Sequence, residues 1–309
     1  MSAFVNLPKE TYPRNAFDPF NPGLGDVDLG NARALMWFSQ LAYETAAKPT
    51  LDFVEGLWNL TNLTPIVDTH VSRTGSFDTR LIVAERAACT IVAFAGTDPF
   101  VWQNLFTDGA FLKTPRGTHE GFQGAFDGVW DQLFPLIQNR SGPMVFTGHS
   151  LGAALAVLAA ERAFDESVRP GGDATLAPAL IYVYGMPRTG NVTWASAYDR
   201  KLGTKTFRFV HASDIVARVR KLGFQHVGRM LNCETGKKFT VPPPPLALGS
   251  NEPSLTSGAV AAVAAWIVQV GGGNLFAAVG PGRLGWTFRF LPLPIRDHLQ
   301  DQYWEALTP

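Results

Sequence analysis

A serine flanked by glycines lies where the sequence predicts that a strand turns into a helix. Residues 148–152 read Gly-His-Ser-Leu-Gly, which fits the pattern G-x-S-x-G around Ser150. Such a serine can act as a nucleophile, because a tight strand-to-helix turn lifts its hydroxyl clear of the sheet. The start of the following helix offers free N–H groups and a positive dipole end to an oxyanion. The alternative is a Gly-Ser turn that merely begins a helix.

The segments on either side of Ser150 favour the interpretation that this serine is a nucleophile. The apolar run at 144–147 predicts a strand leading into the turn, and the small residues that follow predict a helix at 153–164. This strand–turn–helix context is what the motif requires, whereas the five residues alone are weak evidence.

A nucleophilic serine needs a histidine as base, and that histidine needs an acid to orient it. On a sheet with this turn, the acid and then the histidine follow the serine along the chain. The best acid is Asp214, just past a predicted strand at 206–210, at a carboxyl end where such sheets build their sites. Asp199 lies in a helix-like segment, where we expect it to be solvated.

Only two of the six histidines satisfy this order. His226 lies in a predicted short strand, where a structural imidazole is the commoner outcome. His298 lies at the start of a predicted terminal helix, after a proline-rich loop that could bring it over the sheet. Order along the chain favours His298 and leaves His226 open. The remaining four precede or adjoin the serine or precede the acid: His70, His119, His149 and His211.

The alternation of apolar strands with helices predicts an α/β fold with a mainly parallel sheet covered on both faces. We expect the first two dozen residues to wrap the surface, and Pro135 to kink or end its helix. No internal repeat is present, and we expect residues 1–309 to form one domain. Helices are predicted at 31–45, 120–138, 153–164 and from 298 onward, and strands at 66–71, 80–85, 89–95, 144–147, 180–184 and 206–210.

Composition excludes several classes of partner. Apolar residues make up 46% of the 309, and 26 basic residues balance 26 acidic ones, so nothing points to nucleic acid. Cys89 and Cys233 lack metal-ligand spacing and make no disulfide framework, and no metal or cofactor is expected. The chain as given starts without a secretory pattern. Localisation therefore stays open between the cytoplasm, which the few cysteines slightly favour, and secretion by another route or as a trimmed form.

Residues 241–285 differ from the rest in character. The segment opens with four prolines at 242–245 and carries no charge between Glu252 and Arg283. An apolar helix at 259–270 would be about 18 Å long, short of the roughly 30 Å of a bilayer core, so no transmembrane span is predicted. The segment could pack over the core or flank the mouth of the active site.

Several blocks of the chain resemble the class 3 lipases, the fungal-type triacylglycerol lipase family. The resemblance runs from about Ala34 to Tyr303, and the most specific block is the Gly-x-Pro-Arg-x-Gly-Asn turn at 185–191. One departure is Ala95, where the family usually has arginine. The blocks lie at 92–97, 119–122, 147–154, 184–191, 208–216 and 297–303.

This resemblance implies an α/β-hydrolase fold and a catalytic triad of Ser150, Asp214 and His298. It also implies that Thr97 and Leu151 supply the N–H groups of an oxyanion hole. A lid is implied at about 98–112, with four apolar side chains that suit a flap opening against an oily surface: Phe100, Val101, Trp102 and Leu105.

The expected activity is hydrolysis of carboxylic esters of lipids or acylglycerols, and an oil–water or membrane interface is an expected place for it. The same residues would also serve a feruloyl or short-chain carboxylesterase, a phospholipase or an acyltransferase. A serine peptidase fits the lipase-specific blocks less well. A catalytically idle lipid-binding module is the alternative from another class, and the intact triad argues against it.

Overall fold

A seven-stranded sheet forms the centre of the protein. The computed structural model describes residues 7–72, 75–96, 113–138, 140, 142–219, 223–241 and 293–309. The sheet runs in chain order, antiparallel from β1 to β3 and parallel from β3 to β7. Its strands are β1 Thr61–Ser72, β2 Gly75–Arg86, β3 Cys89–Phe94, β4 Met144–His149, β5 Pro178–Tyr184, β6 Thr206–His211 and β7 Arg229–Cys233.

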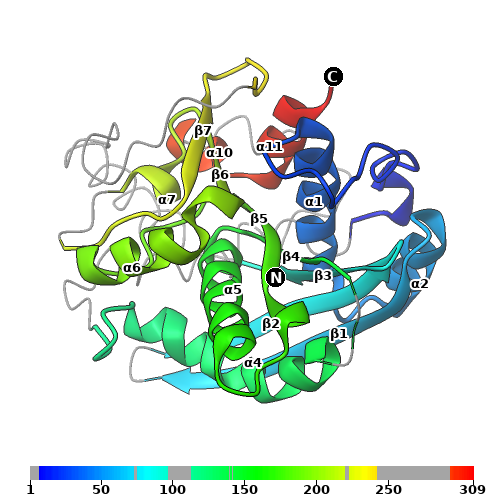
Figure 1. Ribbon diagram of the computed structural model, residues 1–309. Helices are drawn as coiled ribbons and strands as arrows, with labels where there is room; N and C mark the ends of the chain where they lie inside the picture. Colours follow the sequence, from blue (N-terminus) through cyan, green and yellow to red (C-terminus); the bar gives the residue numbers. More distant parts are fainter. Residues whose placement is uncertain are drawn as a thin grey trace.

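Helices cover both faces of this sheet (Figure 1). The helix α1 and the C-terminal α11 pack together on one face, while α4, α5 and α6 cover the other. The α-helices are α1 Leu29–Leu41, α2 Lys48–Leu57, α4 Glu120–Gln138, α5 Leu151–Val168, α6 Val192–Leu202, α7 Ile215–Arg218, α10 Leu293–Arg296 and α11 Gln300–Leu307. Short 3-10 turns are η1 Lys9–Thr11, η2 Ala42–Glu44, η3 Ala174–Leu176 and η4 Gly203–Lys205.

The side chains of β3 show why the sheet is covered twice. Every residue of this strand is buried, and successive side chains point to opposite faces. Ile91 and Ala93 join the apolar cluster under α1, whereas Val92 and Phe94 join the cluster under α4 and α5. A strand that is apolar on both faces is typical of a parallel sheet between two helical layers. The predicted fold class is therefore confirmed.

Three expectations about local structure were wrong. The N-terminal segment does not merely wrap the surface, since Tyr12, Phe17 and Phe20 are buried in the core, where burying aromatic rings is favourable. The helix α4 does not end early at Pro135 but continues to Gln138. Asp199 is half-buried, and its Oδ1 accepts a hydrogen bond from the amide of Gly228.

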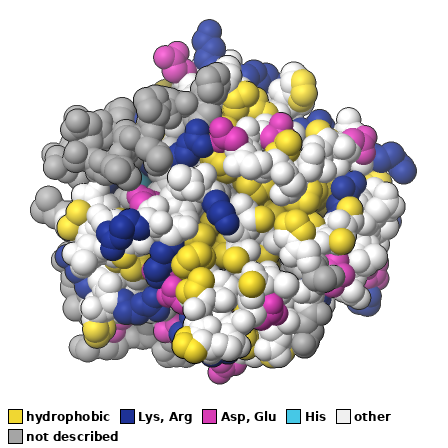
Figure 2. Space-filling view, in the orientation of Figure 1, with side chains coloured by type: hydrophobic (Ala, Val, Ile, Leu, Met, Phe, Trp, Pro, Cys, Tyr) yellow, Lys and Arg dark blue, Asp and Glu magenta, His cyan; other side chains and the backbone are white. Residues whose placement is uncertain are grey.

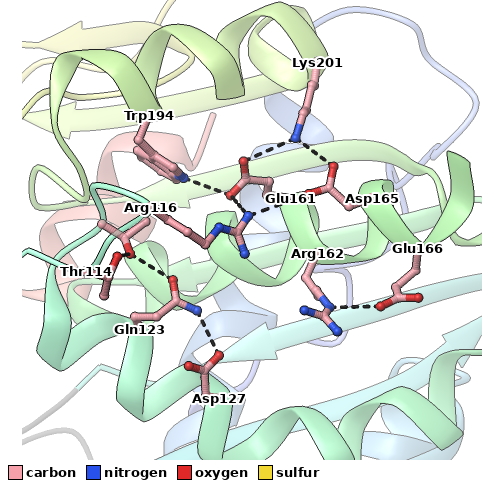
Figure 3. Close-up of polar contacts among 11 residues, drawn as sticks. Thr114, Arg116, Gln123, Asp127, Glu161, Arg162, Asp165, Glu166, Trp194 and Lys201 are labelled. Carbon is pink, nitrogen blue, oxygen red and sulfur yellow. Dashed lines mark hydrogen bonds and ion pairs between the residues drawn. The ribbon is translucent and has the colours of Figure 1, made fainter. Parts of the chain in front are cut away.

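Charged side chains of both signs are scattered over the face shown in Figure 2, with hydrophobic ones between them. Some charges form a polar cluster that joins α5 to α6 and to the segment before α4 (Figure 3). At its centre, Glu161 accepts a hydrogen bond from Trp194 Nε1 at 2.9 Å and contacts Arg116 and Lys201 at 3.4 and 3.5 Å. We call these four residues the Glu161 cluster. It ties together helices on one side of the sheet.

Candidate active site

Ser150 lies at the sharp turn between β4 and α5. Its backbone has φ 60° and ψ −129°, in the left-handed half of conformational space that residues other than glycine rarely adopt. Its amide donates to the carbonyl of Tyr184 on β5, which fixes the turn against the sheet. The side chain is buried, and Oγ makes no hydrogen bond within the described residues. Strain of this kind persists where the surrounding structure holds it, and it is common at catalytic residues.

The turn is tight enough to require glycine beside the serine. A Cβ atom on Gly148 would lie 2.3 Å from the carbonyl oxygen of Gly152, closer than real contacts allow. The strand–turn–helix arrangement expected around Ser150 is therefore present, and β4 extends to His149, further than predicted.

Asp214 follows β6 and caps α7. Its Oδ1 accepts hydrogen bonds from the amides of Val216 and Ala217 at 2.8 and 3.1 Å. Both carboxylate oxygens lie 2.8 Å from Nδ1 of His298, and the Tyr303 hydroxyl donates to Oδ2 at 2.5 Å. Burial would raise the pKa of Asp214, but the charge of His298 and these hydrogen bonds outweigh it and hold that pKa below its usual range. The carboxylate therefore stays ionised, and His298 Nδ1 must be the donor.

His298 lies in the turn between α10 and α11, not at the start of a helix as expected. Its amide donates to the carbonyl of Ile295, and the residue is fully buried. Its ring centroid is 4.7 Å from that of His149, the residue before Ser150. The imidazole is thus placed between Asp214 and the strand end that carries the serine.

His149 contributes to this arrangement, which the sequence reasoning did not predict. Its Nε2 lies 2.8 Å from the carbonyl oxygen of His298, and its Nδ1 lies 3.1 Å from the hydroxyl of Tyr43. Because a carbonyl only accepts, Nε2 carries the proton and Nδ1 accepts from Tyr43. Burial, followed by the charge of His298, lowers the pKa of His149 to about 3. A neutral His149 therefore anchors the backbone of His298.

The structure places His226 elsewhere. It lies in an irregular segment before β7, not in a strand, and its Nε2 lies 2.9 Å from the carbonyl oxygen of Ala217. Burial, together with the charges of Arg208 and Arg188, lowers the pKa of His226 well below its usual range. Of the two histidines left open by chain order, His298 is the one in contact with Asp214.

Gly185, directly after β5, lies beneath the acid and the histidine. Its φ is 59°, and a Cβ atom there would lie 2.8 Å from Asp214 Oδ2 and 2.8 Å from His298 Nδ1. Its amide donates to the carbonyl of Phe209 on β6. The turn after β5, in the block at 184–191, thus leaves room for the two side chains to meet.

Part of the predicted oxyanion hole can be placed. Leu151 is the first residue of α5, where N–H groups have no acceptor within the helix. Gly96 packs against the turn, since a Cβ atom there would lie 2.9 Å from Ser150 Cβ. The other residues named for the oxyanion hole and the lid lie outside the described residues: Thr97, Phe100, Val101, Trp102 and Leu105.

Two other findings concern ligands and membranes. Within the described ranges, no group of three or more His, Cys, Asp or Glu side chains is placed to hold a metal ion. No described helix is both long and apolar enough to cross a bilayer. The apolar segment at 259–270, with most of the predicted insertion at 241–285, lies outside the described residues.

The sequence matches known proteins over its middle. Residues 92–224 match the family described as "Lipase (class 3)". A secreted mono- and diacylglycerol lipase of Malassezia globosa is 32% identical over 154 residues, which is 44% of this chain and 48% of the relative. A lipase of Rhizopus niveus is 30% identical over 178 residues, covering 53% of this chain and 43% of the relative. The chain thus spans less than half the length of these relatives.

Solved structures support the fold. Lipase II of Rhizopus niveus superposes with a TM-score of 0.50 at 22% identity, covering 68% of this chain and 83% of that one. A triacylglycerol lipase whose catalytic centre is described as a serine protease triad gives a TM-score of 0.51 at 22% identity, covering 66% and 79%. At this identity the likeness shows the α/β-hydrolase fold alone. The family match covers less than half of the chain, so the chain is similar to class 3 lipases over residues 92–224.

Proposed function

We propose that this protein is a serine hydrolase that cleaves carboxylic esters of lipids, with Ser150 as nucleophile, His298 as base and Asp214 as the orienting acid. One observation carries the proposal: a buried carboxylate–imidazole pair at 2.8 Å lies beside a strained serine at a strand-to-helix turn. These are the parts that acyl transfer through a serine requires.

The reaction follows from the hydrogen bonds. Because Nδ1 of His298 donates to Asp214, Nε2 is the nitrogen that takes the proton of the Ser150 hydroxyl. The serine oxygen bonds to the ester carbonyl carbon, and the carbonyl oxygen becomes an oxyanion. His298 returns the proton to the leaving alcohol as the carbon–oxygen bond breaks. Water then attacks the acyl-enzyme by the same sequence, releasing the acid and restoring the serine.

The oxyanion would be held by backbone N–H groups. Leu151 is suited to this by its place at the start of α5, where the helix dipole also favours negative charge. Thr97 is the second donor that we propose, and it directly follows Gly96, which packs against the serine. Thr97 and the lid at 98–112 remain predictions from the resemblance.

The class of substrate is supported by the relatives. The matched proteins include mono- and diacylglycerol lipases, and a rice phospholipase A1 is 31% identical over 106 residues, 34% of this chain and 26% of that protein. We therefore expect acylglycerol esters to be hydrolysed faster than phospholipids or water-soluble short esters. Rates on triglyceride emulsions, phospholipid vesicles and p-nitrophenyl esters of increasing chain length would measure this order.

The proposal is tested by replacing the nucleophile. Ser150→Ala is expected to abolish fluorophosphonate labelling and to lower p-nitrophenyl ester hydrolysis by about four orders of magnitude. Ser167→Ala is the control, because Ser167 lies at the far end of α5 and bonds to the carbonyl of Phe164. It should label like the wild type. Full labelling of the Ser150→Ala protein would show that another residue is the nucleophile. An unlabelled wild type that still binds lipid vesicles would favour the idle module.

A further inference from the structure

Two short segments cross at the candidate site, and each carries one imidazole and one carboxylate. The end of β6 and the turn after it supply His211 and Asp214, while the turn between α10 and α11 supplies Asp297 and His298. The proposed reaction uses Asp214 and His298. The reaction does not use His211 and Asp297, which also face each other.

The geometry of this second pair is that of a buried contact. Nδ1 of His211 lies 3.6 Å from Oδ1 of Asp297, and the two side chains are 3% and 1% exposed. Neither atom has a hydrogen bond within the described residues. The other carboxylate oxygen, Oδ2, accepts from the amide of Ser213 at 3.0 Å. Because leaving a buried polar atom unpaired is costly, the His211–Asp297 contact is the interaction available to both atoms.

Several charged or titratable groups surround the pair. Asp214 and Arg296 act on both members, and Asp297 also faces the thiol of Cys233. The Tyr303 hydroxyl accepts from the amide of His211 at 3.1 Å, and Arg218 donates to the carbonyl of Ala212. Burial lowers the pKa of His211 and raises that of Asp297. When the His211–Asp297 pair loses the proton that the two side chains share, its net charge is negative, one residue from His298.

The turn that carries His298 depends on such contacts for its position. It is bounded by the four-residue α10 and the eight-residue α11, and among the described residues it meets the end of β6 through side-chain contacts. Asp214–His298 is one crossing contact, and His211–Asp297 with the Ser213 amide is a second beside it. Together with the bond from His149 Nε2 to the His298 carbonyl, these two contacts restrict rotation of the turn.

We propose, on the basis of the serine hydrolase function proposed above, that His211 and Asp297 are positioning residues. Their contact holds the His298 turn on the end of β6 and so keeps the base aligned with Ser150.

The test compares Asp297→Asn with Asp199→Asn. Asp199 also accepts a backbone amide bond, but it contacts Gly228 at the amino end of β7, the opposite end of the strands from the site. Asp297→Asn is expected to lower kcat/KM on p-nitrophenyl butyrate about tenfold or more, mainly through kcat, since misplaced catalytic groups lose rate steeply. The acid limb of the pH profile of kcat/KM for Asp297→Asn should move to lower pH by about half a unit. Removing a nearby negative charge disfavours protonation of the base.

A second pair of variants keeps the test valid if Asp297→Asn does not fold. His211→Asn places an amide N–H near the Nδ1 position and should retain kcat/KM within about threefold, whereas His211→Leu should lose as much as Asp297→Asn. Unfolding curves give the folded fraction of each variant. Activities corrected for that fraction exclude a loss of activity caused by simple destabilisation. Equal kcat/KM and equal pH profiles for Asp297→Asn and Asp199→Asn, or equal loss in His211→Asn and His211→Leu, would overturn the inference. Failure of the hydrolase proposal is distinguished by fluorophosphonate labelling: either Ser150→Ala would be labelled like the wild type, or the wild type would not be labelled at all.

Discussion

Asp214 and Glu161 are both buried carboxylates, but they face different partners. Asp214 meets the imidazole of His298 and the hydroxyl of Tyr303, and both of these side chains are buried. Glu161 meets an indole N–H and two cations, Arg116 and Lys201, which are 47% and 31% exposed. Guanidinium and ammonium groups are cations at neutral pH, whereas an imidazole can gain and lose a proton there.

The difference separates a structural carboxylate from one able to serve chemistry. The Glu161 cluster joins α5 to α6 through groups that do not change charge near neutral pH (Figure 3). The Asp214 side chain instead stabilises positive charge on His298, which is the charge that forms during acyl transfer. Burial of an acid is thus not a sufficient sign of a catalytic site; the partner must be able to titrate.

The largest expected effect comes from replacing the acid itself. Asp214→Asn removes the acceptor that orients His298 Nδ1, so we expect kcat to fall by about three to four orders of magnitude. Hydrolysis of p-nitrophenyl butyrate at pH 8 measures it. A fall of less than tenfold would mean that the buried carboxylate, like Glu161, is only structural.

An intermediate effect is expected from the tyrosine that bridges the acid to β6. Tyr303→Phe removes the hydroxyl that donates to Asp214 and accepts from the His211 amide. Hydrogen bonds to a charged group contribute about 1.5–3 kcal/mol, so the free energy of unfolding should drop by that order, with kcat/KM lower by about tenfold.

The control for this variant is Tyr198→Phe. Tyr198 is equally buried, but its hydroxyl bonds to neutral Thr206 at 2.9 Å under α6. Urea unfolding should show a loss of about 1 kcal/mol, and activity should not change. If both variants lost the same activity, the Tyr303 hydroxyl would have no particular role at the site.

The smallest effect is expected in the Glu161 cluster. Glu161→Gln keeps an acceptor for Trp194 but removes the charge that pairs with Arg116 and Lys201. Because both cations are partly exposed, the loss should be about 1 kcal/mol or less, smaller still in high salt, with kcat unchanged. Unfolding at two salt concentrations beside the hydrolysis assay measures both. A large fall in kcat would erase the contrast with Asp214.

Local patterns made much of the site predictable. The apolar strand, the glycines and the small-residue helix around Ser150 are all neighbours in sequence, so the turn could be predicted directly. Asp214 was predictable for a related reason, since residues just past parallel strands gather at one edge of the sheet. Both expectations depend on short segments whose conformation is set largely by their own residues.

The contacts made across the fold were less predictable. Chain order could not choose between His226 and His298, because the choice depends on how a turn after 292 packs on β6. The same applies to His149, whose ring packs against His298 although its position next to the serine had set it aside. Tyr43 gave no signal at all, since a single hydroxyl after α1 has no pattern around it.

Gly185 shows that a site can impose demands on a residue that takes no part in its chemistry. Any side chain there would occupy the volume in which Asp214 and His298 contact each other. In a scan of random substitutions, position 185 should therefore tolerate as little as the triad while contributing no reactive group. Substitutions meant to widen the site or change its specificity should therefore keep Gly185 and begin with residues farther from it.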